Sequence, residues 1–115
     1  MAIIRLKNFS FQEFLCKCGC GMLPTTDLMH RVDALRENLG VPLIVHSGAR
    51  CPAHNRSVGG ALHSQHVKGL AADLRHPDNP AQLIGLADKL GFRGVGVYST
   101  FTHVDLRDHR AFWTG

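Results

Sequence analysis

Two histidines and one aspartate carry the clearest chemical signal in this sequence. His66 lies in a polar stretch, Asp73 follows it after Gly69, and His103 comes much later in the chain. Gly69 permits a sharp turn, so a loop histidine can fold back beside the carboxylate of the following strand. Two imidazoles and one carboxylate, with a fourth position left for water, are a typical ligand set for catalytic zinc. The spacing also fits histidines that only cap and pack, so both interpretations stay open.

The histidine content is high for so small a chain. Eight histidines stand beside nine aspartates and glutamates in 115 residues. Imidazole is the side chain that exchanges protons and binds metals near neutral pH. His46 and His63 are candidates for donating a proton to a leaving amine, and an ordinary polar role in a loop is the simpler explanation for each of them.

Four cysteines form a second feature, with Cys16, Cys18 and Cys20 crowded together and Cys51 apart. Zinc sites usually separate paired cysteines by two to four residues, so a spacing of one fits a compact tetrahedral site poorly. An oxidising compartment would allow a disulfide between Cys51 and one of the other three. Free or partly buried thiols are the simplest interpretation, and a structural metal is the third.

Length and composition restrict the class of protein. A chain of 115 residues suits one domain, over residues 1–115, and 44% hydrophobic with 19% charged residues predicts a packed core. No apolar run approaches the roughly 18 residues that a membrane span requires. The net charge of +4 is spread along the chain without the basic stripe of a nucleic-acid-binding face. We therefore expect a monomer with neither nucleic acid nor membrane as a partner.

Hydrophobic periodicity and capping residues predict the helices and strands on which these residues lie. Helical patterns cover four segments, at 10–15, 25–39, 53–58 and 80–90. The last of them has Asn79 as its expected N-cap and Pro80 in its first turn. Strand patterns cover 41–46, 70–74, 94–98 and 102–106. Since only one strand–helix–strand crossover is visible, the pattern predicts an α+β fold.

Several short motifs occur in an order that resembles a known family. They are Ser47-Gly48-Ala49-Arg50, His54-Asn55, Val58-Gly59-Gly60, Ser64-x-His66-x-x-Gly69-x-Ala71-x-Asp73, Gly94-Val95-Gly96 and His103-Val104-Asp105. Together they closely resemble the zinc D-Ala-D-Ala carboxypeptidase family of peptidoglycan peptidases, and its small phage, prophage and cell-wall branch in particular. The opening from Asn8 through Cys16-x-Cys18-Gly19-Cys20-Gly21 is similar to that branch as well. The resemblance covers nearly the whole chain.

The resemblance implies a fold and a set of functional residues. The fold would be of the hedgehog/DD-peptidase type, a small antiparallel sheet with flanking helices and the metal on the sheet. His66, Asp73 and His103 match the family's zinc ligands, and Arg50 matches an arginine that holds the substrate carbonyl or the oxyanion. Ser64 matches a residue that lines the substrate cleft. The simpler alternatives are a structural salt bridge for Arg50 and a backbone-capping hydroxyl for Ser64.

The general base is where this sequence departs from the family pattern. Many members carry Asp or Glu three residues before the second zinc histidine, where this chain has Thr100, and others carry His at the position of Phe101. Asp105 would face the same side of a strand as His103. We expect Asp105 to act as the base, or else to accept the second ring N–H of His103 and fix its tautomer. Tyr98 would line the cleft or donate to the oxyanion, with packing as its alternative.

These expectations combine into a function. We expect a zinc peptidase that hydrolyses a peptide bond in the stem or cross-link of peptidoglycan, with a D-Ala-containing bond as first choice. The alternatives are a zinc-bearing peptidoglycan-binding module without turnover and an endolysin of the same fold that cuts the L-Ala–D-Glu bond. The chain opens without a recognisable secretory signal. That agrees with a phage or prophage lysin acting on the wall in the periplasm or outside the cell, or with a signal already removed.

Overall fold

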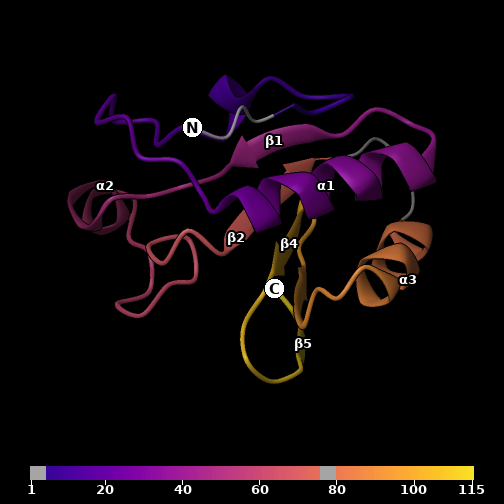
Figure 1. Cartoon of the computed structure of the whole chain (residues 1–115). Coiled ribbons are helices and arrows are strands. Elements are labelled where there is room, and N and C mark those ends of the chain that lie inside the picture. Colours follow the sequence, from indigo (N-terminus) through magenta and orange to yellow (C-terminus); the bar gives the residue numbers. More distant parts are fainter. Residues whose placement is uncertain (1–4, 76–79) are drawn as a thin grey trace.

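A five-stranded sheet, in the order β1-β2-β4-β3-β5, forms the centre of the computed structural model, which describes residues 5–75 and 80–115. Its strands are β1 (Ile44–Ser47), β2 (Ala71–Arg75), β3 (Gly94–Val97), β4 (Thr102–Asp105) and β5 (Ala111–Thr114). The helical elements are the 3-10 turn η1 (Phe11–Phe14), α1 (Thr26–Leu39), α2 (Pro52–Ser57) and α3 (Ala81–Lys89). Figure 1 shows α2 and α3 on opposite sides of the molecule, with α1 between them. The α+β class is confirmed.

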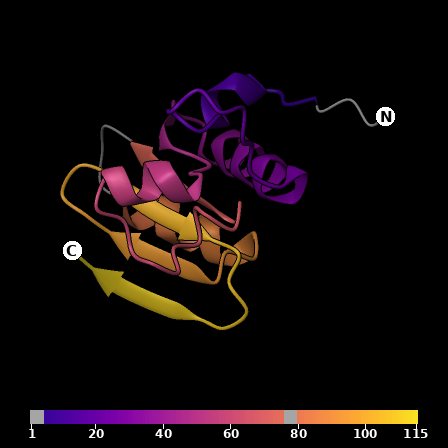
Figure 2. The same cartoon turned by 90° about the vertical axis from the view of Figure 1, so that its left-hand side faces the viewer.

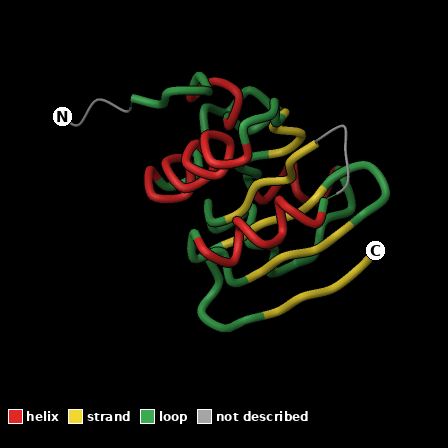
Figure 3. Tube along the Cα trace, turned by 90° about the vertical axis from the view of Figure 1, so that its right-hand side faces the viewer, coloured by secondary structure: helices red, strands yellow, loops and turns green. Residues whose placement is uncertain are grey.

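The sheet is antiparallel over its first four strands, as expected, and β5 then adds parallel to β3. The strand pattern of the sequence did not include β5. Figures 2 and 3 show β5 as the outermost strand, at the opposite end of the molecule from the N-terminal segment. An edge strand receives ladder hydrogen bonds from one neighbour, so four residues suffice to form it once β3 is in place.

η1 and α1 begin at capping side chains, and α1 ends at a glycine. α3 begins at Ala81, so Pro80 is its N-cap residue and lies before the first turn in which it was expected. Thr25 Oγ1 accepts a hydrogen bond from the Leu28 N–H at 3.2 Å, and Gly40 ends α1 in the left-handed conformation with φ of 76°. Ser10 and Glu13 form the predicted capping box around η1. Asn79, the expected cap of α3, lies outside the described residues. No helix in the described ranges is long and apolar enough to cross a membrane.

The prediction of a buried strand over 41–46 needs correction. β1 begins at Ile44, whose side chain is 58% exposed because β1 forms the other edge of the sheet. β1 also contains an irregularity: Val45 pairs with Leu74, yet Ser47 pairs with Asp73. Two residues of β1 thus oppose one of β2, which places Ser47 on the face opposite to buried Val45.

The hydrophobic core occupies one face of the sheet. Ala72, Leu74, Val95 and Val104 contribute to it from the strands, and α1 and α3 pack against each other and supply most of the remaining core side chains. Truncation of a fully buried leucine in such a core costs about 2–5 kcal/mol. Side chains alternate along a strand, so the residues between these apolar positions face the other side of the sheet. The polar groups discussed below lie on that second face.

Candidate metal centre

One row of paired residues crosses the sheet and carries the candidate site. Asp73 pairs with Ser47 on one side and with His103 on the other, His103 pairs with Gly96, and Gly96 pairs with Trp113. All five positions share the face opposite to the core. A Cβ atom on Gly96 would overlap the indole ring. This glycine therefore lets the tryptophan of β5 lie across β3 and reach His103, with ring centroids 5.3 Å apart.

Three possible ligand atoms converge on this row. Asp73 Oδ1 lies 3.1 Å from His66 Nε2 and 2.9 Å from His103 Nδ1. The three atoms lie within 4.8 Å of one another. The two imidazole rings are 5.1 Å apart with an angle of 68° between their planes, so they approach the carboxylate from different directions. This donor set fits a metal ion such as zinc. The structure therefore brings together the three residues that the sequence predicted as ligands.

His66 lies on the loop before β2, and backbone hydrogen bonds fix that loop. The His66 carbonyl accepts from the N–H groups of Arg50 and Gly69, each at 3.2 Å. Gly69 has φ of 75°, the sharp turn that the sequence predicted. His66 Nδ1 lies 2.7 Å from the Gly48 carbonyl oxygen. That contact uses Nδ1 as the donor to Gly48, so Nε2 is the ring nitrogen that faces Asp73.

His103 is oriented by a carboxylate in the same manner. Its Nε2 lies 2.7 Å from Asp105 Oδ2, so its Nδ1 is the nitrogen that faces Asp73. Asp105 is fully buried and also accepts from the Arg107 side chain at 2.9 and 2.7 Å and from its N–H at 3.1 Å. Gly94 opposes Asp105 in the sheet, where a Cβ atom would overlap the carboxylate. Both oxygens thus have donors, an arrangement that favours the tautomer-fixing role over that of the base.

The electrostatics of the site favour a cation. Burial by itself would raise the pKa of Asp73, but hydrogen bonds with His103 and His66 hold that pKa well below its usual value. Burial likewise opposes ionisation of Asp105, and Arg107 and His103 lower its pKa more strongly. Burial would lower the pKa of His103, yet its contacts with Asp105 and Asp73 raise it. Two ionised carboxylates flanking His103 therefore stabilise positive charge, whether a proton or a metal ion.

A cleft of about 450 Å³ opens over the site. Its lining consists of Arg50, Ala61, His63, Ser64, Gln65, His66, Asp73, Tyr98, Phe101, His103, Arg107 and Trp113. This volume is in the usual range for a site that binds a small organic ligand or a short peptide segment. The residues predicted to bind substrate thus surround the predicted metal ligands.

Arg50 is held beside the metal ligands. Its Nη2 lies 3.2 Å from Asp73 Oδ2, its Nε donates to Ser47 Oγ at 3.2 Å, and its Nη1 donates to Asn55 Oδ1 at 3.4 Å. Its side chain remains 15% exposed, toward the cleft that it lines. The salt bridge anticipated as the simpler role is present, and it fixes the guanidinium at the edge of the cleft.

Ser64 and Tyr98 each make a local contact as well as lining the cleft. Ser64 Oγ accepts from the His66 N–H at 3.2 Å, so this hydroxyl helps to shape the turn that carries a ligand. The Tyr98 hydroxyl accepts a hydrogen bond from Trp113 Nε1 at 2.8 Å. The Tyr98 ring stacks on the Phe101 ring, with the ring centroids 4.6 Å apart. Packing and cleft lining thus coexist in both residues.

Two further residues of the cleft wall, Arg107 and Trp113, were not among the predicted site residues. The Arg107 guanidinium lies 4.9 Å from the Trp113 ring centre and also binds Asp105. For Trp113 the sequence favours packing of the C-terminus onto the core, with lining of the groove as the alternative, and the structure shows the alternative. The alternation of Ala111–Thr114 would have indicated a strand, but a four-residue pattern is too short to be decisive. His63 lines this cleft and His46 does not. The His46 ring stacks on the Phe101 ring, with the ring centroids 5.6 Å apart.

Comparison with known proteins agrees with this geometry. In a comparison with curated proteins, none matched the chain. The model of the Peptidase M15 family matches residues 7–105, which include the three candidate ligands His66, Asp73 and His103 and end at Asp105. The chain therefore belongs to the peptidase M15 family, that of the zinc D-Ala-D-Ala carboxypeptidases, and is a metallopeptidase.

Proposed function

We propose that this protein is a zinc-dependent peptidase that hydrolyses a D-Ala-containing peptide bond in the stem or cross-link of peptidoglycan. The convergence of His66 Nε2, Asp73 Oδ1 and His103 Nδ1 at the cleft carries this proposal. The zinc ion, when bound by these atoms, supplies an acidified water molecule and polarises the scissile carbonyl. The protein would act at the cell wall, in the periplasm or outside the cell, as a monomer.

Arg50 is the group that we assign to the carbonyl oxygen of the scissile bond. Its guanidinium is permanently charged and is fixed by Ser47 and Asp73 before substrate arrives. Prearranged donors of this kind stabilise the negative charge that develops on the oxygen as the bond is attacked. The contact with Asp73 does not prevent this role, because the five N–H groups of a guanidinium exceed the three contacts made inside the protein.

Asp105 and His63 divide the remaining tasks. We assign Asp105 to holding His103 in the tautomer that directs Nδ1 at the metal, because both of its oxygens are bonded and it has no exposed surface. His63 is exposed and lines the cleft, so its imidazole is accessible to carry a proton between water and the leaving amine. His46 does not line this cleft but lines an adjoining hollow together with Arg50 and Asp73, so it is the second candidate after His63.

The walls of the cleft suit a short peptide with small side chains and carboxylates. Tyr98, Phe101 and Trp113 form an apolar wall, while Arg50 and Arg107 contribute positive charge. Stem peptides of peptidoglycan combine alanine methyl groups with free carboxylates, so they match both parts. The net charge of +4 adds weak long-range attraction to an anionic wall.

Digestion of purified peptidoglycan tests the proposal, with the products identified by mass spectrometry. Release of D-Ala indicates a carboxypeptidase, conversion of cross-linked dimers to monomers indicates an endopeptidase, and new amino-terminal D-Glu indicates L-Ala–D-Glu cleavage. His66→Ala serves as the inactive control. If zinc is bound and no bond is cut in several wall chemistries, the activity proposal is wrong, and a binding module without turnover replaces it.

A further inference from the structure

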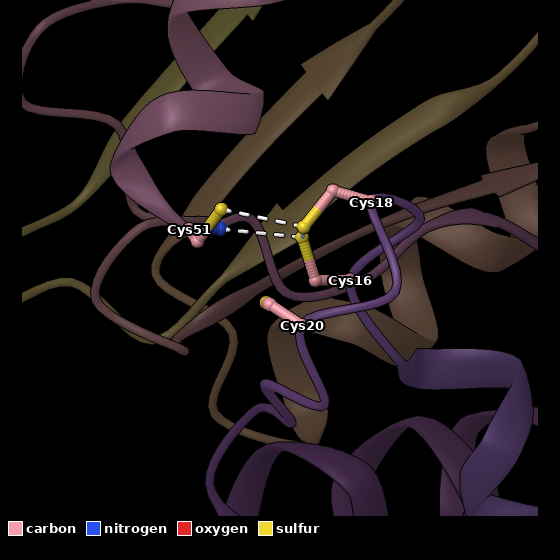
Figure 4. Close-up of side chains that lie close together, drawn as sticks. All are labelled: Cys16, Cys18, Cys20 and Cys51. Atoms are coloured by element: carbon pink, nitrogen blue, oxygen red, sulfur yellow. Dashed lines mark hydrogen bonds between the residues drawn. The ribbon is translucent and has the colours of Figure 1, made fainter.

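The four cysteines of the chain gather at a second place, outside the peptidase cleft. Cys16, Cys18 and Cys20 lie on the loop between η1 and α1, and Cys51 directly precedes α2. Their four sulfur atoms lie within 4.8 Å of one another, although 31 positions separate Cys20 from Cys51. Figure 4 shows the four side chains in the space between this loop and the start of α2. We call this group the cysteine cluster.

We propose that the cysteine cluster binds one zinc ion through four thiolates, as a structural site separate from the catalytic one. Sulfur atoms of a tetrahedral zinc site lie about 3.8 Å apart, since each Zn–S bond is about 2.3 Å. Cys16 and Cys18 sulfurs are 3.4 Å apart, and Cys18 and Cys51 sulfurs are 3.5 Å apart. A disulfide bond would require about 2.05 Å. All-thiolate sites are selective for soft metals, of which zinc is the usual structural choice.

Two glycines explain how cysteines spaced by one residue can share an ion. Gly19 and Gly21 have φ of 86° and 88°, a conformation that residues with a side chain rarely adopt. The Gly19 N–H donates to the Cys16 carbonyl at 3.2 Å, and the Cys16 N–H donates to the Met22 carbonyl at 2.9 Å. The chain therefore turns back on itself between Cys16 and Met22, which brings the three sulfur atoms of this loop together. The expectation that this spacing fits a tetrahedral site poorly assumed an ordinary backbone.

Backbone N–H groups are directed at two of the sulfur atoms. The Cys51 N–H lies 3.3 Å from Cys16 Sγ, and the His54 N–H lies 3.4 Å from Cys51 Sγ. Backbone donors in these positions hold the two sulfur atoms in place and stabilise the negative charge of metal-bound sulfur. Cys16 is buried and Cys51 is half-buried, whereas Cys18 and Cys20 are exposed. An ion could therefore enter from the solvent side while the inner sulfurs remain fixed.

The location of the cysteine cluster gives it a structural task. Cys51 follows Arg50, so an ion there would hold the loop that carries the arginine of the cleft. The same loop is joined to η1 by the hydrogen bond from the Ala49 N–H to the Phe14 carbonyl at 3.0 Å. A bound ion would add a second link between the two segments and would resist fraying of the η1–α1 loop.

Metal content measured by elemental analysis on freshly purified protein tests the proposal. We expect two zinc ions per chain in the natural sequence, one in Cys20→Ser and one in His66→Ala. The Lys17→Ser variant is the matched control, because it changes an exposed residue of the same loop and should retain two ions. The His66→Ala protein reports on the cysteine cluster alone, so failure of the catalytic proposal leaves this test intact.

Two further measurements, cobalt spectroscopy and thiol alkylation, complete the test. Cobalt substitution should give an intense sulfur-to-metal charge-transfer band that persists in His66→Ala and disappears in Cys20→Ser. Mass spectrometry after alkylation should show thiols protected by the metal, and four alkylated thiols after chelation. A metal-free His66→Ala protein would overturn the proposal, and so would a disulfide in place of the thiols. Iron instead of zinc, visible as a red colour, would correct the identity of the metal.

Discussion

The two candidate metal sites of this small protein are built in opposite ways. The site of His66, Asp73 and His103 lies on neighbouring strands and an adjoining turn, and each imidazole is oriented by an acceptor on its far nitrogen. The cysteine cluster lies on loops, where glycines with positive φ and a few N–H groups shape it. A site fixed by a sheet keeps its shape for catalysis, whereas a site on loops depends on its ion for order. Under the two proposals, the metal of the sheet site would serve chemistry and the metal of the cysteine cluster would serve stability.

Removal of a ligand from the sheet site should have the largest effect on activity. In His66→Ala, one of three ligand atoms is lost, and the buried Asp73 carboxylate loses a partner. We expect peptidase activity to fall to background and one zinc ion to be lost, while the cysteine cluster keeps its ion. Product release and elemental analysis on the same sample measure both. Substantial activity in this variant would contradict the assignment of the sheet site as catalytic.

Replacement of Arg50 should give the next largest effect. We expect Arg50→Ala to lower kcat by about 10²–10³, the cost of losing one prearranged donor to the oxyanion. Arg50→Lys should restore little, since an ammonium cannot make the contacts to Ser47, Asn55 and Asp73 together. Zinc content must stay unchanged in both variants. A rise in KM with unchanged kcat would instead assign Arg50 to substrate binding.

Asp105→Asn separates the two roles left open for this carboxylate. If Asp105 positions His103, we expect zinc affinity to fall by about 10–100-fold and activity to return at saturating zinc. The position of the pH–rate profile should then stay the same. If Asp105 is the base, the variant should stay inactive with its zinc site filled. Titration of activity against zinc distinguishes these outcomes.

Cys20→Ser tests whether the cysteine cluster contributes to the stability of the fold. Loss of an ion that links the η1–α1 loop to α2 should lower Tm by roughly 5 °C for each kcal/mol lost, while the sheet site keeps its zinc. Activity at 25 °C should fall far less than in His66→Ala. Thermal unfolding with and without a chelator measures the effect, with Lys17→Ser as control. An unchanged Tm would show that the cluster contributes nothing to stability.

Tyr98→Phe should have the smallest effect. The variant keeps the ring that stacks on Phe101 and removes the hydroxyl that accepts from Trp113 Nε1. One hydrogen bond at a cleft open to water is worth about 1 kcal/mol, or a change of about fivefold in KM or kcat. Steady-state kinetics on a stem peptide measures it. A loss of a hundredfold or more would assign the hydroxyl to the oxyanion.

Helices and strands could be predicted from the sequence where capping residues and side-chain periodicity within the segment determine them. The caps of α1 at Thr25 and Gly40 are read directly, and the strands carrying Asp73 and His103 lie within a residue or two of their predicted bounds. β5 was not predictable, because an edge strand of four residues forms only when β3 offers it a partner. The edge position of β1 and its bulge likewise depend on the neighbouring strand.

The functional groups themselves could be identified from the sequence: two imidazoles and a carboxylate in a motif that resembles a peptidase family, an arginine, and four thiols. The hydrogen-bond partners of these side chains could not be predicted, because contacts between segments far apart in the chain leave no pattern in the sequence. The tertiary structure decided that Asp105 bonds to the far side of His103, that Trp113 covers Gly96, and that Cys51 meets the other cysteines. Each of these contacts requires the sheet or the packed loops to be formed first.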